Sequence, residues 1–280
     1  MRFDTLAIIG AGLLGGSVGL AAKARGLCRH VVGVGRNPAT LARAKELGVL
    51  DEFTTNLTAG VAGADVVVVC SPVDLIAKQA LEAAAAAKPG VLITDVGSTK
   101  GTIVRDVEAR LPPGVAFVGA HPLAGSEKQG AEFAKADLFV NRTCVLTPTA
   151  HTAAADVKRA TQFWEAVGCV VKTLSPEEHD LALATTSHLP HFIAALLARQ
   201  VPPAWLPYTA TGFRDATRIA AGDPHLWAAI ARENALAVSH ALAAFAGQLD
   251  ALRDAVLSQN EDDLVRLLAD AKRVRDALGS

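Results

Sequence analysis

Three polar side chains in the first half of the chain could transfer protons and bind an anion. Ser98 and Lys100 closely follow the expected strand 91–95, and His121 directly follows the expected strand 115–120. Histidine titrates near neutral pH and can act as a general base, whereas serine and lysine can bind the oxygen atoms of a substrate. Because ligands of parallel α/β sheets bind beyond the carboxyl ends of the strands, these positions predict a functional site with a catalytic His121. A hydrogen-bonded loop histidine is the alternative.

A second set of candidate residues lies in the helical second half of the chain. Arg214 and Arg218 are four residues apart, and Asp215 precedes Arg218 by three, so a helix would place both guanidinium groups on one side. Such a pair can bind a substrate carboxylate, although a solvated, salt-bridged surface is the alternative. His188 and His191 are three residues apart and share a helix face. They have no convincing third ligand, so we expect substrate contact or helix–helix hydrogen bonding and no metal site.

A glycine-rich turn near the start of the chain predicts a dinucleotide site. Gly10, Gly12 and Gly15 have the spacing G-x-G-x-x-G between the apolar run 6–9 and a helical pattern. Gly10 would permit the tight turn, Gly12 the approach of a pyrophosphate, and Gly15 close packing of helix on strand. An ordinary glycine-rich strand–helix turn is the alternative. Other residues expected to contact the cofactor are Leu13, Leu14, Ser71, Pro72 and Gly97.

The end of the second strand indicates which dinucleotide is bound. NAD-binding folds carry an acidic side chain there, about 20 residues after the glycines, to bind the ribose hydroxyls. This chain has Gly35 at that position, and the next residue, Arg36, has a guanidinium suited to a phosphate. We therefore favour NADP over NAD. The alternative is that Arg36 is an ordinary surface residue and that either cofactor fits.

Alternating apolar strands and amphipathic helices must position these residues, which predicts an α/β fold. We expect an N-terminal Rossmann-type parallel sheet domain over residues 1–173 and an all-α dimerisation domain over residues 174–280. The strands are expected at 6–9, 30–35, 64–70, 91–95, 115–120, 143–147 and 169–173. In the second half, Ser175 and Glu178 predict a capping box, Pro190 predicts a kink, and one long helix is expected from Pro224 to about residue 259.

Composition excludes some partners and suggests a compartment. The 280 residues have a formal net charge of −1, which gives no basic face for nucleic acid. The four cysteines show no disulfide or metal spacing, the chain opens directly into a strand, and we expect no apolar run long enough to cross a membrane. These features predict a cytoplasmic protein. Alanine-rich apolar stripes in the C-terminal helices predict a homodimer.

Five motifs, taken together and in order, add a family resemblance. They are GAGLLGGS at 10–17, DVGSTK at 95–100, HPLAGSE at 121–127, SHLPH at 187–191 and GFRDATRIA at 212–220. This combination closely resembles the prephenate/arogenate dehydrogenases of tyrosine biosynthesis. The resemblance implies oxidative decarboxylation of prephenate to 4-hydroxyphenylpyruvate, with hydride transfer to NAD(P).

The resemblance also implies roles for individual residues. His121 would accept the hydrogen bond of the substrate hydroxyl with help from Ser98, and Arg218 would hold a substrate carboxylate. Glu127 would gate the site, and His188 and His191 would line the substrate pocket. We expect Lys100 and Arg214 to contribute to substrate binding as well. Gly35 departs from the acidic residue of many relatives, which puts a preference for NAD in doubt.

Several alternatives remain open at this point. Arogenate differs from prephenate in carrying an amino acid in place of the pyruvyl group, and the shared motifs do not separate an enzyme for one from an enzyme for both. A β-hydroxyacid or imino-acid dehydrogenase also pairs a nucleotide fold with a helical dimerisation domain. A catalytically silent NADP-binding sensor is the alternative from outside the enzymes, although His121 and Arg218 are both present.

Overall fold

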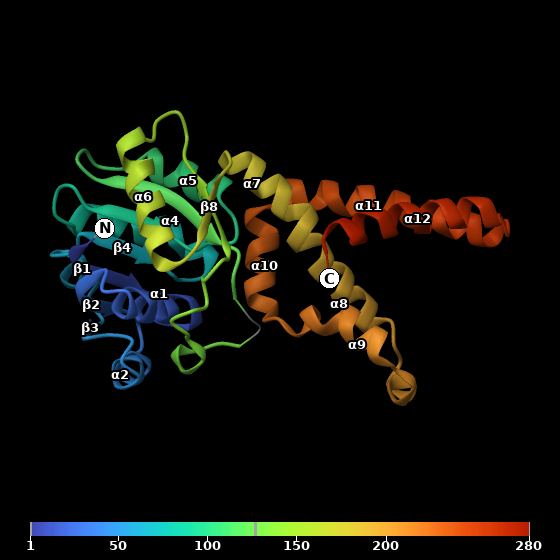
Figure 1. Cartoon of the computed structure of the whole chain (residues 1–280), viewed down its shortest axis with the longest axis horizontal. Coiled ribbons are helices and arrows are strands. Elements are labelled where there is room, and N and C mark those ends of the chain that lie inside the picture. Colours follow the sequence, from blue (N-terminus) through green and yellow to red (C-terminus); the bar gives the residue numbers. More distant parts are fainter. Residues whose placement is uncertain (1, 126–127, 280) are drawn as a thin grey trace. The chain divides into compact units, whose positions relative to one another are not determined.

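The computed structural model describes residues 2–125 and 128–279. The chain forms two compact units, Met1–Ala235 and Leu236–Ser280. The first unit contains a twisted sheet with helices on both faces, followed by a series of helices (Figure 1). All of the candidate site residues belong to this first unit, apart from Glu127, which lies outside the described residues together with Ser126.

The sheet has eight strands in the order β3-β2-β1-β4-β5-β6-β7-β8. The six strands from β3 to β6 pair in parallel, β7 pairs antiparallel with β6, and β8 pairs in parallel with β7. This is a Rossmann-type sheet with two added strands, which confirms the predicted fold class. The strands are β1 (Phe3–Ile9), β2 (Cys28–Val34), β3 (Glu52–Thr54), β4 (Val66–Val69), β5 (Leu92–Asp95), β6 (Ala116–Pro122), β7 (Thr143–Thr147) and β8 (Val170–Thr173).

Helices cover both faces of this sheet and bury an apolar core against each. One core contains residues from α1 (Leu13–Ala24), α2 (Pro38–Glu46) and α6 (Ala154–Val167). The other contains residues from α3 (Leu57–Val61), α4 (Val73–Ala86), α5 (Gly101–Glu108) and α10 (Pro224–Glu233). Successive strand residues alternate between the two cores, as a sheet covered on both faces requires: Ile8 enters the first and Ile9 the second.

The remaining helices follow β8, with one short exception between β6 and β7. They are η1 (Ala131–Phe133), α7 (Pro176–Leu183), η2 (Ala184–His188), α8 (Leu189–Arg199), η3 (Pro203–Tyr208), α9 (Thr211–Thr217), η4 (Arg218–Ala221), α11 (Ala235–Leu257) and α12 (Glu261–Ala277). The capping box of Ser175 and Glu178 is present at the start of α7. Where the sequence predicts a kink at Pro190, the helix has a π-helical turn, η2, just before this proline.

Two features of the prediction are corrected by the structure. The strand β3 and the helix α3 were not expected, since three and five residues are too short to show a periodic pattern. The single helix expected from Pro224 to about residue 259 is interrupted at Asn234, where the backbone leaves the helical conformation (φ −118°, ψ 36°). Asparagine is a poor helix former, and this side chain makes hydrogen bonds elsewhere in the protein.

Two helical segments are long and apolar enough to cross a membrane by length and composition alone. They are Pro176–Arg199 and Ala235–Leu257, which contain 18-residue windows with mean hydropathies of 1.4 and 1.3. The expectation that no run reaches this length is therefore wrong. Core helices of soluble proteins meet the same criterion, so the absence of membrane binding stays a prediction.

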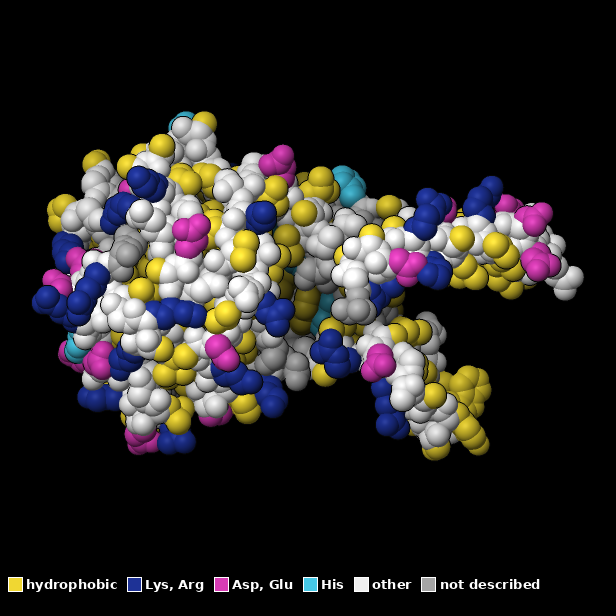
Figure 2. Space-filling view, viewed as in Figure 1, with side chains coloured by type: hydrophobic (Ala, Val, Ile, Leu, Met, Phe, Trp, Pro, Cys, Tyr) yellow, Lys and Arg dark blue, Asp and Glu magenta, His cyan; other side chains and the backbone are white. Residues whose placement is uncertain are grey.

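The second compact unit leaves large apolar side chains exposed along its two helices. Leu236, Leu257 and Leu268 are 80%, 74% and 64% exposed. Figure 2 shows hydrophobic side chains gathered along α11 and α12 on the visible face. Such apolar stripes on helices with no sheet to cover are typical of a surface that is buried by another chain.

Candidate active site

A cleft of about 1090 Å³ opens beyond the carboxyl ends of the central strands. The glycine-rich turn, the loops that follow β4, β5 and β6, and residues of η2, α8, η4 and α10 line it. His121 and Arg218, which come from different halves of the sequence, both lie in this one cleft. The other predicted site residues that line it are Gly12, Leu13, Leu14, Ser71, Pro72, Gly97, Ser98, His188 and His191.

The geometry of the glycine turn fits a dinucleotide. A Cβ atom on Gly15 would lie 2.1 Å from the Gly10 carbonyl oxygen, so only glycine allows this approach of α1 to β1. Gly10 has a φ of 95°, and a Cβ on it would lie 2.8 Å from the carbonyl oxygen of Cys70, the residue that follows β4. In contrast, a Cβ on Gly12 would meet nothing within 4 Å, so the space above the N-terminus of α1 is open. Backbone N–H groups and the helix dipole favour a phosphate at that place.

A single buried carboxylate connects the loop that carries Ser98 with the end of β6, which carries His121. Asp95, at the end of β5, accepts a hydrogen bond at Oδ2 from the Gly97 N–H (2.8 Å) and one at Oδ1 from the Ala120 N–H (2.9 Å). Gly97 precedes Ser98 and Ala120 precedes His121, so one side chain fixes the backbone next to both. Sequence reasoning treated Asp95 as the end of a strand and as part of the 95–100 motif, and gave its side chain no role.

Lys100 lies elsewhere than the prediction placed it. Its side chain is fully buried, with an exposure of 0%, and its ammonium group forms an ion pair with Asp95, which is also fully buried. It is not among the residues that line the cleft. The role that this position supports is to neutralise Asp95 inside the protein.

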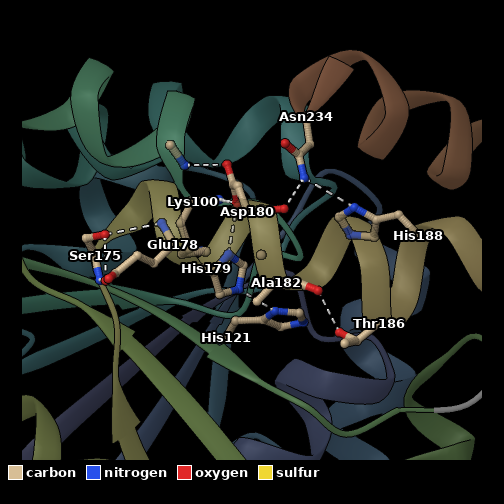
Figure 3. Close-up of polar contacts among 12 residues, drawn as sticks. Lys100, His121, Ser175, Glu178, His179, Asp180, Ala182, Thr186, His188 and Asn234 are labelled. Atoms are coloured by element: carbon tan, nitrogen blue, oxygen red, sulfur yellow. Dashed lines mark hydrogen bonds and ion pairs between the residues drawn. The ribbon is translucent and has the colours of Figure 1, made fainter. Parts of the chain in front are cut away.

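A row of buried polar groups leads from His121 away from the cleft (Figure 3). The Nδ1 atom of His121 lies 2.9 Å from Nε2 of His179 on α7. The Nδ1 atom of His179 lies 2.8 Å from Oδ1 of Asp180. The two carboxylate oxygens of Asp180 accept hydrogen bonds from the backbone N–H groups of Lys100 (2.7 Å) and Gly101 (2.8 Å). The helical half therefore supplies the hydrogen-bond partner of the candidate base.

Burial keeps the histidines of this region neutral. It lowers the pKa of His121 well below 6.5, and the neighbouring His179, Lys100 and His188 lower it further by charge repulsion. Burial also lowers the pKa of His179, against the opposing effect of its hydrogen bond to Asp180. The pKa of His188 falls to about 4, again mainly through burial. A neutral imidazole is the form of His121 that can accept a proton.

Two further histidines form a wall of the cleft. His188 is 1% exposed, and its Nδ1 atom lies 3.3 Å from Nδ2 of Asn234, which also donates to the Asp180 carbonyl oxygen (2.7 Å). His191 stacks on Trp227 of α10, with ring centroids 3.5 Å apart and an interplanar angle of 9°. Both rings have a buried nitrogen without a hydrogen-bond partner, Nε2 of His188 and Nδ1 of His191. A bound ligand could use these polar atoms.

The remaining predicted residues are not brought into the cleft. Arg214 and Arg36 are exposed and do not line it, although Arg36 follows β2 closely. Gly10 and Gly15 lie behind the turn and shape it. Glu127 is outside the described residues, so its gating role stays a prediction. Among residues 2–125 and 128–279, no three His, Cys, Asp or Glu side chains are arranged to hold a metal ion.

Sequence reasoning missed His179, Asp180 and Asn234 as site residues. The first two belong to the buried stripe of α7, whose members are Pro176, His179, Asp180 and Leu183. These positions have the helical spacing i, i+3, i+4 and i+7, so polar residues at core positions were a usable indication. Nothing local in the sequence indicates the partner of Asn234.

Comparison with known proteins gives a consistent result along the chain. The family model described as "Prephenate dehydrogenase, nucleotide-binding domain" matches residues 18–173, and that described as "Prephenate dehydrogenase, dimerization domain" matches residues 175–270. The cyclohexadienyl dehydrogenase of Zymomonas mobilis is 37% identical over 99% of this chain and 96% of its own length. The prephenate dehydrogenase of Bacillus subtilis is 34% identical over 98% of this chain and 76% of its own length.

Solved structures agree with the sequence comparison. Prephenate dehydrogenase from Aquifex aeolicus, in complex with hydroxyphenyl propionate and NAD+, superposes with a TM-score of 0.92, 33% identity and 99% coverage of each chain. Synechocystis arogenate dehydrogenase gives a TM-score of 0.83 and 29% identity, over 98% of this chain and 99% of its own. The chain therefore belongs to the prephenate/arogenate dehydrogenase family of nicotinamide-dependent oxidoreductases.

Proposed function

We propose that this chain oxidises prephenate to 4-hydroxyphenylpyruvate and CO₂ and reduces NADP or NAD. The observation that carries the proposal is that His121, Ser98 and Arg218 line one cleft together with the glycine turn of a dinucleotide site. The relatives named for prephenate or cyclohexadienyl substrates share almost the whole chain, which supports the same reaction. Arogenate is the second candidate substrate, supported by the likeness to the Synechocystis enzyme.

The reaction assigns a definite task to His121, Ser98 and Arg218 in the cleft. The glycine turn would hold the pyrophosphate of the dinucleotide, whose nicotinamide would supply the hydride acceptor. His121 accepts the hydroxyl proton as the hydroxyl-bearing carbon loses its hydride and becomes a carbonyl. Loss of the ring carboxylate as CO₂ then returns an electron pair to the ring, and His121 gives the proton back to the new phenol oxygen. Ser98 assists at the same oxygen, and Arg218 holds a carboxylate of the dianionic substrate.

The test of this proposal is an activity assay with a substitution at the base. Purified protein is mixed with prephenate or arogenate and with NADP or NAD, and reduced nicotinamide is followed by its absorbance. His121→Asn is expected to lower kcat by about 10²- to 10⁴-fold, the usual contribution of general-base catalysis. The exposed His151 lies outside the cleft, so His151→Asn is the matched control. An unchanged kcat in His121→Asn would refute the assigned role.

The cofactor preference is proposed to be NADP. Gly35 offers no carboxylate to the ribose hydroxyls, and the exposed Arg36 follows β2 where a 2′-phosphate would need a cation. Arg36→Ala is then expected to raise KM for NADP far more than KM for NAD. Arg43→Ala, at an exposed arginine paired with Glu46 on α2, is the control. Equal effects of Arg36→Ala on both cofactors would contradict the preference.

We also propose a function for each part of the chain and an oligomeric state. Residues 1–173 would bind the nucleotide, and residues 174–280 would contribute to the substrate site and form a homodimer through the C-terminal helices. The dimerization-domain match at 175–270 and the exposed leucines of α11 and α12 support the dimer. Sedimentation of the wild-type chain tests it. We propose that the protein is a cytoplasmic enzyme that acts on a small-molecule substrate and has no nucleic-acid or membrane partners.

A further inference from the structure

The buried contacts behind His121 determine which of its nitrogens carries the proton. A carboxylate can only accept hydrogen bonds, and both oxygens of Asp180 already accept backbone N–H groups. The Nδ1 atom of His179, 2.8 Å from Oδ1 of Asp180, must therefore be the protonated nitrogen of that ring. A neutral imidazole carries one proton, so Nε2 of His179 is left as an acceptor.

The same reasoning extends one ring further. Nε2 of His179 lies 2.9 Å from Nδ1 of His121, and an acceptor at this distance requires a donor opposite. Nδ1 of His121 therefore holds its proton, and Nε2, on the opposite side of the ring, keeps the lone pair. We propose that His179, held by Asp180, is a positioning residue that fixes the His121 tautomer with Nε2 as the base. This inference rests on the proposed function.

The charged and titratable groups around these two rings are compatible with this arrangement. His121 on β6 has Lys100 from the start of α5 and His188 from η2 as neighbours, in addition to His179. His179 has Asp95 from β5 as a further neighbour, together with Lys100 and Asp180. The ammonium of Lys100 is paired with Asp95 and opposes a second positive charge on either histidine. Both rings therefore stay neutral, as the proton assignment requires.

The proton balance of the reaction explains why the row of hydrogen-bonded groups from His121 through His179 to Asp180 can be closed to solvent. The hydroxyl proton that His121 accepts is returned when decarboxylation forms the phenol, so no net proton leaves the site. His179 has an exposure of 0%. The row of hydrogen-bonded groups ends at Asp180, whose two carboxylate oxygens accept hydrogen bonds from backbone N–H groups. A row of this kind can orient the base and stabilise a transient imidazolium, and it has no need to deliver a proton to water.

The tautomer can be measured directly, without any activity. Long-range ¹H–¹⁵N correlation spectra of the full-length protein with ¹⁵N-labelled histidine distinguish a protonated Nδ1 from a protonated Nε2, and the His121→Asn spectrum identifies the His121 signals. We expect Nδ1 of His121 to be protonated in the wild-type chain. A protonated Nε2 with a bare Nδ1 would overturn the proposal, whatever the protein's substrate.

Two substitutions of His179 separate positioning from a general loss of structure. In His179→Gln the amide oxygen reaches the place of Nε2 and can still accept from His121, whereas in His179→Asn the shorter side chain reaches only toward Asp180. We expect His179→Asn to lose the Nδ1–H tautomer and to lower kcat about 10- to 100-fold, the worth of a charge-assisted hydrogen bond. His179→Gln should restore both, with KM unchanged in each variant.

Each outcome has a distinct meaning. Equal losses of kcat in the two variants at similar thermal stability would overturn the positioning role, as would a wild-type tautomer in His179→Asn. A wild-type protein that oxidises neither prephenate nor arogenate would refute the proposed function, while the spectra would still decide the tautomer.

Discussion

Replacement of Lys100 by methionine tests whether this residue is a buried ion-pair partner or a substrate ligand. Methionine keeps most of the apolar stem and removes the charge. Lys100 and Asp95 are both 0% exposed, and removal of one partner from a buried pair costs about 3–5 kcal/mol because the other charge is left unpaired. The two backbone N–H groups bound to Asp95 remain, so we expect the lower end of that range, about 3 kcal/mol.

Thermal and chemical unfolding measure this loss, and kinetics measure its consequence for the base. At about 2–4 °C per kcal/mol, Tm should fall by about 6–12 °C. Because the Lys100 charge lowers the pKa of His121, its removal should move the acid limb of kcat/KM to higher pH. KM for the substrate should change little, since Lys100 does not line the cleft.

The matched control is the same substitution at an exposed ion pair. Lys88 pairs with Asp65 at the surface, with side-chain exposures of 44% and 30%, and Lys88→Met should cost about 0–1 kcal/mol. Equal losses in the two variants would refute the argument from burial. A large rise in KM with unchanged stability in Lys100→Met would return Lys100 to the substrate site.

Four further predictions address the cleft. Arg218→Ala should raise KM about 100-fold, the worth of a charge-assisted bidentate contact of roughly 3 kcal/mol, whereas Arg214→Ala, outside the cleft, should leave KM nearly unchanged in the same steady-state assay. Since burial lowers the pKa of His121 well below 6.5, kcat/KM should stay level as the pH falls to 6.5 and decline only in more acidic solution. The lowered pKa of His188, about 4, requires the unfolded chain to bind more protons below pH 6.5, so Tm should fall between pH 6.5 and 4. Gly15→Ala places a Cβ 2.1 Å from the Gly10 oxygen and should cost about 1–3 kcal/mol or more and weaken nucleotide binding in a titration, whereas Gly63→Ala, with open space around it, should not.

The α/β half was predictable because the local hydrophobic pattern of most strands matches their burial in the sheet. The run Val66–Val69 is fully buried, and such a run between turn residues predicts a central parallel strand at once. The strand β3 shows the limit of this reasoning, since it is three residues long and only partly buried. It is a strand because β2 offers it hydrogen bonds, and that information is not local.

The candidate site was predictable where a strand end determines position, and less so where side-chain direction matters. Ser98 lies in the cleft because it follows the end of the parallel strand β5, and His121 because it stands near the end of β6, beyond the residues that pair in parallel with β5. Lys100 follows the same strand as Ser98, yet it turns inward to Asp95, five residues earlier. Sequence spacing showed that Lys100 lies just after the end of β5. It could not show whether the side chain faces the cleft or the core.

His179 and Asp180, two of the residues that were missed, connect the two halves of the sequence, and the third, Asn234, connects elements within the helical half. Asp180 comes from α7 and holds the first N–H groups of α5, while Asn234 joins the Asp180 carbonyl oxygen to His188. Each contact satisfies a buried polar group that would otherwise cost about 1–3 kcal/mol, so the helical half is held to the nucleotide-binding half at the point where His121 lies. The base depends on this junction, because His121 finds its hydrogen-bond acceptor in the helical half. A perturbation of α7 far from the substrate should therefore lower kcat before it affects cofactor binding.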